Sequence, residues 1–350
     1  MSKYIRNIWY PLTWSRNVGR MLSRYVVIEE DIVVYRTEGG VTVALEDACP
    51  HKLAPLSIGT LIGDEVECGY HGLTFDCSGK CVKIPGQPNV PASLKVRAYP
   101  VVENMGMVWI WMGDPSLADT AKVFDLPEYH DPAYSFVEGD ALPVKASYLN
   151  LADNLCDPSH VAFVHKSTLA NKEHGDVPVM YERTDGKIVT WRWIVDSPLI
   201  PIFQGLKEFG GNVDRWHYYN YFAPCIAVID FGSARTGTGA PEGNRSDCIQ
   251  MFACHFITPV DATTCIQHWL CVKNSPADAD VDTRLKAGLR VAFDEDKVLL
   301  EAIQKNEERP RASRPVKLAI DVSSVRMRRM VEEMIESENR PVSTGTAATV

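Results

Sequence analysis

Two short motifs that each pair a cysteine with a histidine constrain this chain more than any other feature. The first is Cys49-Pro50-His51, and the second, after 16 intervening residues, is Cys68-Gly69-Tyr70-His71. Pro50 and the Gly69-Tyr70 pair favour tight turns, so each motif is predicted to form a short loop. The chain must therefore fold so that two loops meet and point four ligand side chains at a shared centre.

Two kinds of metal centre use two thiolates and two imidazoles. In a Rieske [2Fe–2S] cluster two cysteines hold one iron and two histidines hold the other. A structural zinc ion can bind the same four residue types. Zinc fingers usually keep cysteine with cysteine and histidine with histidine, whereas here each loop offers one of each. We therefore predict a Rieske cluster held by Cys49, His51, Cys68 and His71, with structural zinc as the alternative.

Charge and cysteine distribution restrict the class of protein further. The net charge of −9 argues against nucleic acid as a partner, because no basic stripe could replace phosphate counterions. The ten cysteines are scattered, and the chain starts without the apolar segment of a signal peptide, so we expect reduced thiols in the cytoplasm. No apolar run reaches the roughly 18 residues of a membrane helix, so no membrane association is expected.

The pattern of apolar runs predicts an α+β chain of two domains. Residues 1–120 alternate short apolar runs with turn residues, which predicts an all-β domain around the cluster loops. Residues 121–339 are predicted to form an antiparallel sheet with packed helices. The Ser/Thr-rich residues 340–350 are predicted to be a disordered tail. Strands are expected from about 177 to 272, and helices at 147–164, 282–307 and 322–337.

Two further features, a pair of cysteines and a glycine-rich segment, are not predicted to take part in chemistry. Cys77 and Cys81 flank a turn and, because the set of four ligands is already complete, are predicted to be structural rather than additional ligands. The glycines of residues 233–246 do not match G-x-G-x-x-G, and no helix follows them. A dinucleotide site is therefore not expected in this chain.

A second candidate metal site lies in the segment from Asp153 to His165. A helix over residues 147–164 would place Asp153, Asp157 and His160 on one face. His165 can join them only if the helix ends or bends, which Pro158 permits. Two histidines and one carboxylate form the facial triad of non-haem iron enzymes. The alternative is a capped surface helix with two incidental histidines.

The carboxylate that would complete this triad is predicted on the helix over residues 282–307. Asp296 lies in the middle of an apolar stripe formed by Leu285, Leu289, Ala292, Phe293, Leu299 and Leu300. A buried acid needs a partner, and a metal ion is one; a salt bridge to a buried lysine or arginine is the alternative. Asp294 and Glu295 lie off the stripe and are predicted to be solvated.

Together these motifs resemble the oxygenase component of Rieske non-haem iron oxygenases, in particular the vanillate O-demethylase and dicamba monooxygenase group. The resemblance rests on both cluster motifs, on the segment from Asp153 to His165, and on Glu295-Asp296-Lys297. Asn7-x-Trp9-Tyr10 and Arg328-Arg329 also fit. The chain departs from the group at Lys52, where the pattern has arginine; lysine keeps the charge but loses a fork of hydrogen-bond donors.

The resemblance implies a helix-grip catalytic domain and a head-to-tail homotrimer, in which the cluster of one subunit reduces the iron of its neighbour. The cofactors would be one [2Fe–2S] cluster and one Fe(II) per chain, the latter held by His160, His165 and Asp296. Asp157 is predicted to accept a hydrogen bond from His160 and to reach His71 of the partner subunit, with an ordinary helix acid as the alternative. Asn154 is a further candidate in the electron-transfer path.

Electrons are expected to come from NAD(P)H through a separate reductase, directly or through a ferredoxin. Lys52, Lys80 and Lys83 lie near the cluster loops of an otherwise acidic chain. They are therefore a candidate docking surface for that partner. Ordinary solvated lysines are the alternative.

The predicted function is the oxidative O-demethylation of a methoxylated aromatic acid similar to vanillate, using dioxygen. Hydroxylation of a methyl group or ring of a related acid is one alternative. A Rieske electron carrier without oxygenase activity is another, but it would have no use for the His160, His165 and Asp296 set. His255 lies on the same strand face as Met251 and Ala253 and is the candidate substrate contact, with a core or surface histidine as the alternative.

Overall fold

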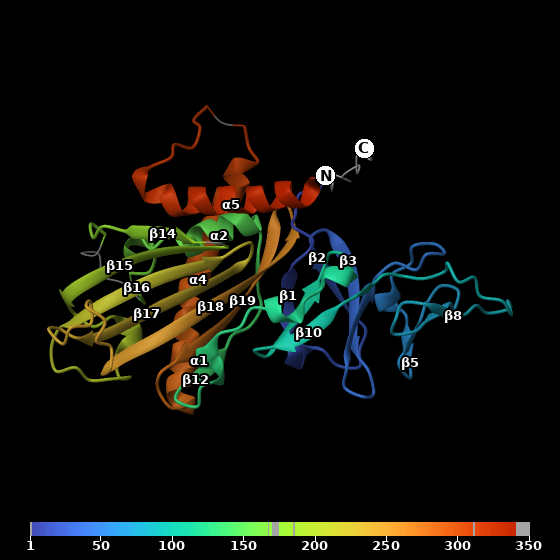
Figure 1. Cartoon of the computed structure of the whole chain (residues 1–350), viewed down its shortest axis with the longest axis horizontal. Helices are drawn as coiled ribbons and strands as arrows, with labels where there is room; N and C mark the ends of the chain where they lie inside the picture. The colour runs from blue at the N-terminus through green and yellow to red at the C-terminus, as the bar shows by residue number, and fades with distance from the viewer. Residues whose placement is uncertain (1, 167, 170–174, 185, 311, 341–350) are drawn as a thin grey trace, which may run out of the picture.

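The computed structural model describes residues 2–166, 168–169, 175–184, 186–310 and 312–340. Figure 1 shows an elongated molecule with a small β-rich half at one end and a large sheet with helices at the other. The first third of the chain forms the small half, so the predicted α+β organisation is confirmed. The domain boundary near residue 120 stays a prediction, because one hydrophobic core contains residues from both halves.

Three small antiparallel sheets form the small half. The first consists of β1 (Trp9–Trp14), β11 (Met107–Trp111) and β10 (Val101–Asn104). The second consists of β2 (Ser23–Val27), β3 (Glu30–Arg36), β4 (Thr42–Glu46) and β9 (Ala98–Tyr99). The third consists of β5 (Thr60–Ile62), β6 (Glu65–Glu67), β7 (Thr74–Phe75) and β8 (Cys81–Lys83). This third sheet lies at the tip of the molecule, so the second cluster motif, between β6 and β7, lies there too (Figure 1).

The large half is built on an eight-stranded antiparallel sheet in the order β12-β19-β18-β17-β16-β15-β14, with β13 also paired to β19. Its long strands are rich in aromatic and β-branched residues, which suit a pleated and partly buried surface. The strand bounds are β12 (Ser135–Glu138), β13 (Leu142–Val144), β14 (Met180–Thr184), β15 (Lys187–Ser197), β16 (Val213–Phe222), β17 (Ile226–Arg235), β18 (Cys248–Asp261) and β19 (Thr264–Lys273).

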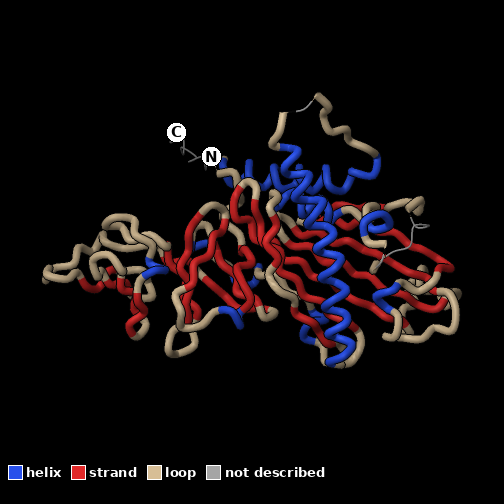
Figure 2. Tube along the Cα trace, turned by 180° about the vertical axis from the view of Figure 1, so that it is seen from behind, coloured by secondary structure: helices blue, strands red, loops and turns tan. Residues whose placement is uncertain are grey.

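Helices pack against the large sheet in two places. Seen from behind, α4 (Ala279–Glu307) runs across the strands (Figure 2), whereas α5 (Val322–Asn339) and α2 (Tyr148–Cys156) pack together, with α2 over the strands β15 to β19 (Figure 1). Two more helices, α1 (Pro127–His130) and α3 (Val161–Val164), are single turns. Short 3-10 turns occur at Ser15–Asn17, Leu56–Ile58, Pro115–Leu117, Thr120–Lys122, Pro201–Phe203 and Ala319–Asp321.

The long helix α4 forms much as its sequence pattern predicts. It begins after Asp278, whose side chain accepts hydrogen bonds from the amides of Asp280 and Val281 at 3.0 Å each. Asp296 and five of the six predicted stripe residues are buried, but Leu299 is 46% exposed, so its place in the buried stripe is a wrong prediction.

The predicted helix over residues 147–164 is in fact two helices, α2 and α3. Asp157 ends α2 with an extended backbone (φ −110°, ψ 106°), as expected for a residue that precedes proline. Its Oδ1 accepts a hydrogen bond from the amide of Ser159 at 2.7 Å, and Asp153 instead pairs with Arg328 of α5. The prediction that Asp153, Asp157 and His160 share one helix face is therefore wrong.

The two halves pack along β18. The ring of Trp109 lies edge-on to that of Phe256 with centroids 5.4 Å apart, and the Thr258 hydroxyl donates to the carbonyl of Pro11 at 2.7 Å. Among the described residues no helix is long and apolar enough to cross a membrane. The predicted disordered tail stays a prediction, because α5 ends at Asn339 and residues 341–350 lie outside the described part of the chain.

Candidate metal centres and substrate pocket

The two cluster loops, Cys49–Ala54 and Cys68–Leu73, have the same backbone hydrogen bonds. In each loop the fifth residue donates its amide to the cysteine carbonyl, at 2.7 and 3.0 Å, and the cysteine amide donates to the carbonyl of the sixth residue, at 2.9 and 2.8 Å. The fifth residues, Leu53 and Gly72, are both left-handed, with φ of 58° and 68°. Local turn chemistry therefore builds two matching loops, as the motifs predict.

Burial separates the four predicted cluster ligands into two pairs. Cys49 and Cys68 are 1% and 2% exposed, whereas His51 and His71 are exposed and their ring centroids lie 4.5 Å apart. Burial raises the pKa of the Cys49 thiol to about 11, and the neighbouring Cys68 thiol adds to the rise. Two buried sulfurs beneath two outer imidazoles fit the [2Fe–2S] cluster, in which one iron takes both cysteines and the other both histidines.

Two further cysteines of the small half, Cys77 and Cys81, contact backbone carbonyls. The Cys81 thiol is buried and lies 3.4 Å from the carbonyl oxygen of Lys83, and the exposed Cys77 thiol lies 3.4 Å from that of Asp64. Each thiol therefore has a local partner, which supports the structural role predicted for both.

The structure brings His160, His165 and Asp296 together. One ligand atom from each residue lies within 4.8 Å of the others. Oδ1 of Asp296 is 3.6 Å from Nε2 of His160 and 3.2 Å from Nε2 of His165. His160 and His165 flank the single turn of α3, so the break at Asp157 is what allows both rings to face α4. The donor set is that of a non-haem iron facial triad.

Electrostatics within the triad favour an ionised Asp296. Burial alone would raise the pKa of this carboxyl, but the hydrogen bond from His165 and the two imidazole charges hold the pKa below its usual value. Burial lowers the pKa of His160, although Asp296 opposes that change. A carboxylate beside imidazole nitrogens is the form that binds a divalent metal.

Asn154 and Asp157, the candidates for electron transfer, occupy different positions around the triad. Nδ2 of Asn154 donates to Oδ1 of Asp296 at 2.9 Å. Oδ2 of Asp157 lies 3.9 Å from Nδ1 of His160, which is too long for a hydrogen bond. The hydrogen bond predicted between Asp157 and His160 is therefore not formed in the single chain, whereas Asn154 contacts the triad directly.

Glu295 is not a solvated helix acid, so that sequence prediction is wrong. Nδ1 of His165 lies 2.9 Å from Oε2 of Glu295 and donates a hydrogen bond to it. Asp294 lies on the outer side of α4, in agreement with the prediction that it is solvated, and its carboxylate pairs with Arg290 at 2.9 Å. Counting the buried stripe misses Glu295, because its partner His165 lies 130 positions earlier in the chain.

A largely apolar cavity lies beside the triad. Val161 follows His160 in the chain, and Phe293 lies about one helical turn before Asp296, so the cavity opens next to the candidate metal ligands. Its apolar walls are formed by Val161, Leu169, Ile229, Phe231, Leu289 and Phe293. Polar groups enter it from the sheet, namely His217, Tyr219 and His255. A mainly apolar lining with a few polar groups is typical of small-molecule sites.

His255 lines this cavity, as the strand alternation predicted for a substrate contact. It is fully buried, its Nδ1 lies 2.8 Å from the amide nitrogen of Gln267, and its Nε2 has no hydrogen-bond partner among the described residues. Burial lowers the pKa of His255 to about 4, so the ring is neutral at pH 7. Gln267 was not predicted, because its meeting with His255 depends on the register of β18 with β19.

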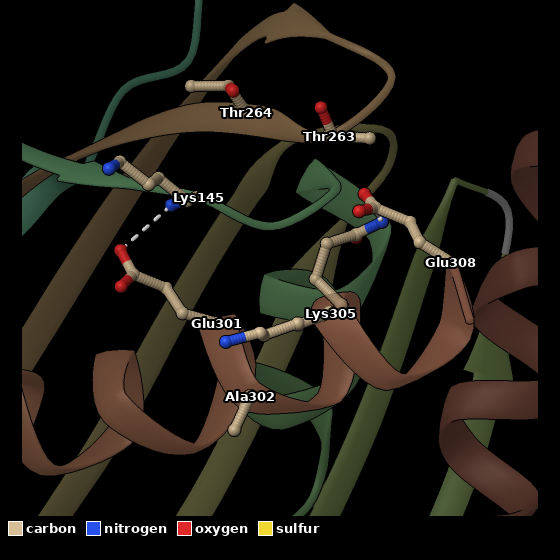
Figure 3. Close-up of a pocket in the computed structure, with 8 residues that line it drawn as sticks. Lys145, Thr263, Thr264, Glu301, Ala302, Lys305 and Glu308 are labelled. Atoms are coloured by element: carbon tan, nitrogen blue, oxygen red, sulfur yellow. Dashed lines mark hydrogen bonds between the residues drawn. The ribbon is translucent and has the colours of Figure 1, made fainter.

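A wider hollow lies against the C-terminal part of α4 (Figure 3). The amide of Lys145 donates to Glu301 at 3.0 Å, and the lining mixes lysines, glutamates and threonines. It contains neither a histidine nor a cysteine and has charges of both signs. Its chemistry therefore does not match that of the triad cavity, and we assign no substrate to it.

Comparisons with known proteins identify the class. The family described as "Rieske [2Fe-2S] domain" matches residues 8–100, and the family described as "Vanillate O-demethylase oxygenase C-terminal domain" matches residues 144–337. The chain is thus a Rieske non-haem iron oxygenase, with a [2Fe–2S] cluster and a mononuclear iron as its cofactors. Within that class it belongs to the vanillate O-demethylase oxygenase family.

The relatives have several different substrates in their names. The iron–sulfur subunit of a toluene-4-sulfonate monooxygenase system from Comamonas testosteroni is 35% identical, over 96% of this chain and 98% of its own. The oxygenase component of dicamba O-demethylase from Stenotrophomonas maltophilia is 32% identical, over 96% and 99%. The crystal structure of dicamba monooxygenase bound to 3,6-dichlorosalicylic acid superposes with a TM-score of 0.89 at 30% identity, covering 97% and 99% of the two chains. The protein is therefore the oxygenase component of a multicomponent aromatic monooxygenase, and the electron-carrier and zinc alternatives are excluded.

Proposed function

We propose that this protein O-demethylates a methoxylated aromatic acid similar to vanillate. The observation that carries the proposal is Nε2 of His255, which has no hydrogen-bond partner in the described part of the chain and lies in an apolar cavity next to the triad. The names of two relatives, vanillate O-demethylase and dicamba O-demethylase, support the reaction. An aromatic ring would pack between the apolar walls, and one oxygen of its acid group would face His255.

The protonation of His255 follows from its partner. The amide nitrogen of Gln267 is a donor, so it requires Nδ1 of His255 to be the acceptor, which places the ring proton on Nε2. The buried His255 is therefore a neutral donor that points into the cavity. A carboxylate or sulfonate oxygen of the substrate would accept this hydrogen bond, and such bonds to charged groups are stronger than neutral ones.

The reaction consumes one dioxygen, two electrons and two protons per methyl ether. Oxygen is inserted into a C–H bond of the methoxy group, the resulting hemiacetal releases formaldehyde and leaves a phenol, and the second oxygen atom leaves as water. The mononuclear iron, held by His160, His165 and Asp296, supplies dioxygen activation. The apolar walls hold the ring and exclude bulk water, and His255 fixes the acid end so that the ether faces the triad.

A second candidate function is hydroxylation of a ring methyl group, favoured by the 35% identity to a toluene-4-sulfonate monooxygenase subunit. The same cavity would bind a methylated aromatic acid through the same hydrogen-bond donor, Nε2 of His255. Oxygen uptake with a surrogate reductase should be measured for methoxy- and methyl-substituted benzoates and sulfonates. Formaldehyde formed in a 1:1 ratio to dioxygen supports demethylation, whereas a benzylic alcohol without formaldehyde supports hydroxylation and contradicts our proposal.

We propose further that the active assembly is a homotrimer in which electrons pass between subunits. Within one chain the second cluster motif lies at the tip of the small half, far along the molecule from α2 and α4 (Figure 1). Large apolar side chains are exposed near both centres, including Leu53 and Tyr70 at the cluster and Phe163 between the two triad histidines. A neighbouring copy would cover both patches. A mass of one chain in solution, with full activity at high dilution, would contradict this arrangement.

The electron donor is proposed to be an NAD(P)H-dependent reductase, alone or with a ferredoxin. Lys52, Lys80 and Lys83 are exposed near the cluster, and only Lys83 has a carboxylate nearby in the described part of the chain, Glu67 at 3.9 Å. An acidic donor would dock there, so the rate of cluster reduction should fall as ionic strength rises. Replacing Lys52 and Lys80 by glutamate should slow reduction by the donor but not by dithionite.

A further inference from the structure

The ring of His165 lies between two consecutive carboxylates of α4. Its Nδ1 is 2.9 Å from Oε2 of Glu295, and its Nε2 is 3.2 Å from Oδ1 of Asp296. The imidazole is almost fully buried, whereas the Glu295 side chain is about one-third exposed. The other histidine of the triad has no such support, because Nδ1 of His160 makes no hydrogen bond to any described residue. The two metal-binding histidines are thus held differently.

Ion pairs within α4 do not explain why Glu295 is an acid. Neighbouring acids on α4 pair with basic residues four positions away, as Asp294 does with Arg290 and Glu301 with Lys297. The residues four positions from Glu295 are Val291 and Leu299, which offer no charge. Among the described residues, His165 is the only ion-pair partner of Glu295.

We propose that Glu295 is a positioning residue, which fixes the tautomer and ring orientation of His165 and thereby secures the mononuclear iron. A neutral imidazole can bind a metal through one nitrogen only if its proton is on the other. When the metal replaces the proton on Nε2, a carboxylate that accepts from Nδ1 keeps the other proton there and leaves the lone pair of Nε2 directed at the metal site. Such outer partners typically change metal affinity by about 10- to 100-fold.

Iron retention tests this role without any substrate. Glu295→Ala removes the acceptor, Glu295→Gln keeps an acceptor oxygen without the charge, and Asp294→Ala is the matched control one residue earlier on α4. Loss of iron to a ferrous chelator should be followed anaerobically in the full-length protein, with acid-labile sulfide as the internal standard. Glu295→Ala should bind iron about 10- to 100-fold more weakly, while Glu295→Gln and Asp294→Ala should stay close to the parent.

The nitric oxide adduct of the ferrous site provides a second readout. Its electron paramagnetic resonance spectrum reports ligand orientation, so it should change shape in Glu295→Ala and be restored in Glu295→Gln. Unchanged affinity and spectrum in Glu295→Ala would overturn the proposal, and so would equal losses in the alanine and glutamine variants. If Glu295→Ala fails to fold, Glu295→Asp, which withdraws the acceptor by one methylene, replaces it in the same comparison. The result is independent of which aromatic acid is demethylated.

Discussion

The side-chain amide of Asn154 donates to Oδ1 of Asp296 at 2.9 Å, although the residues are 142 positions apart in the chain. The same nitrogen lies 3.4 Å from Nε2 of His160. Asn154, near the end of α2, is therefore the point at which this helix contacts the triad carboxylate on α4. Asn154 and Glu295 thus contact all three residues of the triad, Asn154 through Asp296 and His160 and Glu295 through His165.

Replacing Asn154 by alanine should weaken iron binding without removing it. The carboxylate of Asp296 would keep its charge but lose the donor that orients Oδ1, so we expect about tenfold lower iron affinity. Competition with a ferrous chelator measures this. The visible spectrum of the Rieske cluster should not change, because the cluster lies in the other half of the molecule. Parent-like affinity in Asn154→Ala would show that the hydrogen bond does not orient the ligand.

Asp296→Ala should abolish both mononuclear iron and substrate-dependent oxygen uptake, because it removes a ligand of the triad. The iron bound per labile sulfide should fall to the value of the cluster alone. Asp294→Ala should keep most activity, since Asp294 pairs with Arg290 on the outer side of α4. If Asp294→Ala lost its iron and Asp296→Ala kept it, our assignment of the ligand would be wrong.

The sequence predicts ligands better than it predicts the residues that support them. The cluster loops are local, so their spacing and turn residues are enough to predict both the ligand set and the turns. Asp296 stands out because an acid in a buried apolar stripe is unusual. Glu295 and Gln267 were missed because each meets its histidine through a long-range contact, between α3 and α4 or across β18 and β19.

The wrong prediction of one helix over residues 147–164 has the same kind of cause. Helix periodicity extends through the segment, but the extended Asp157 before Pro158 ends α2, and its side chain bonds Ser159 instead. The sequence correctly noted that His165 needs a break in the helix. The structure shows where this break lies: α2 ends at Cys156, before His160, and α3 begins after it.

Asp157→Asn should block electron transfer while leaving both metal centres filled. The carboxylate is not a triad ligand, and its Oδ2 stands 3.9 Å from His160 without a hydrogen bond, so it remains available to a neighbouring subunit. Asparagine keeps the shape but removes the charge. The measurement is re-oxidation of the pre-reduced cluster by dioxygen with substrate bound, in a single turnover. Re-oxidation at the parent rate would assign Asp157 no part in the electron path.

His255→Leu should weaken the binding of aromatic acids far more than that of their neutral analogues. A hydrogen bond to a charged group contributes about 1.5–3 kcal/mol, so KM for the acid should rise about 10- to 100-fold. The methyl ester of the same acid is the matched control, because it fills the apolar walls without offering a carboxylate. Equal increases of KM for acid and ester would indicate that His255 only packs against the ring.

Acid should destabilise the protein through buried neutral histidines, and His268 allows a test away from the site. Its ring is 1% exposed and lies edge-on to Trp14, with centroids 6.2 Å apart. Burial, together with the charge of Arg16, lowers the pKa of His268 to about 4, against 6.5 for an ordinary histidine. In the unfolded chain His268 binds a proton below about pH 6.5, whereas in the folded chain it binds one only below about pH 4. This histidine therefore costs stability as pH falls between those values.

At pH 5 the resulting loss is about 2 kcal/mol of unfolding free energy for this one histidine, relative to pH 7.5. His268→Phe keeps a ring of similar size but cannot titrate. The variant should thus lose about 2 kcal/mol less than the parent between pH 7.5 and pH 5, measured by urea unfolding with tryptophan fluorescence. Any constant effect of the substitution cancels in this difference. An identical pH-dependent loss in parent and variant would mean that His268 is already protonated in the fold.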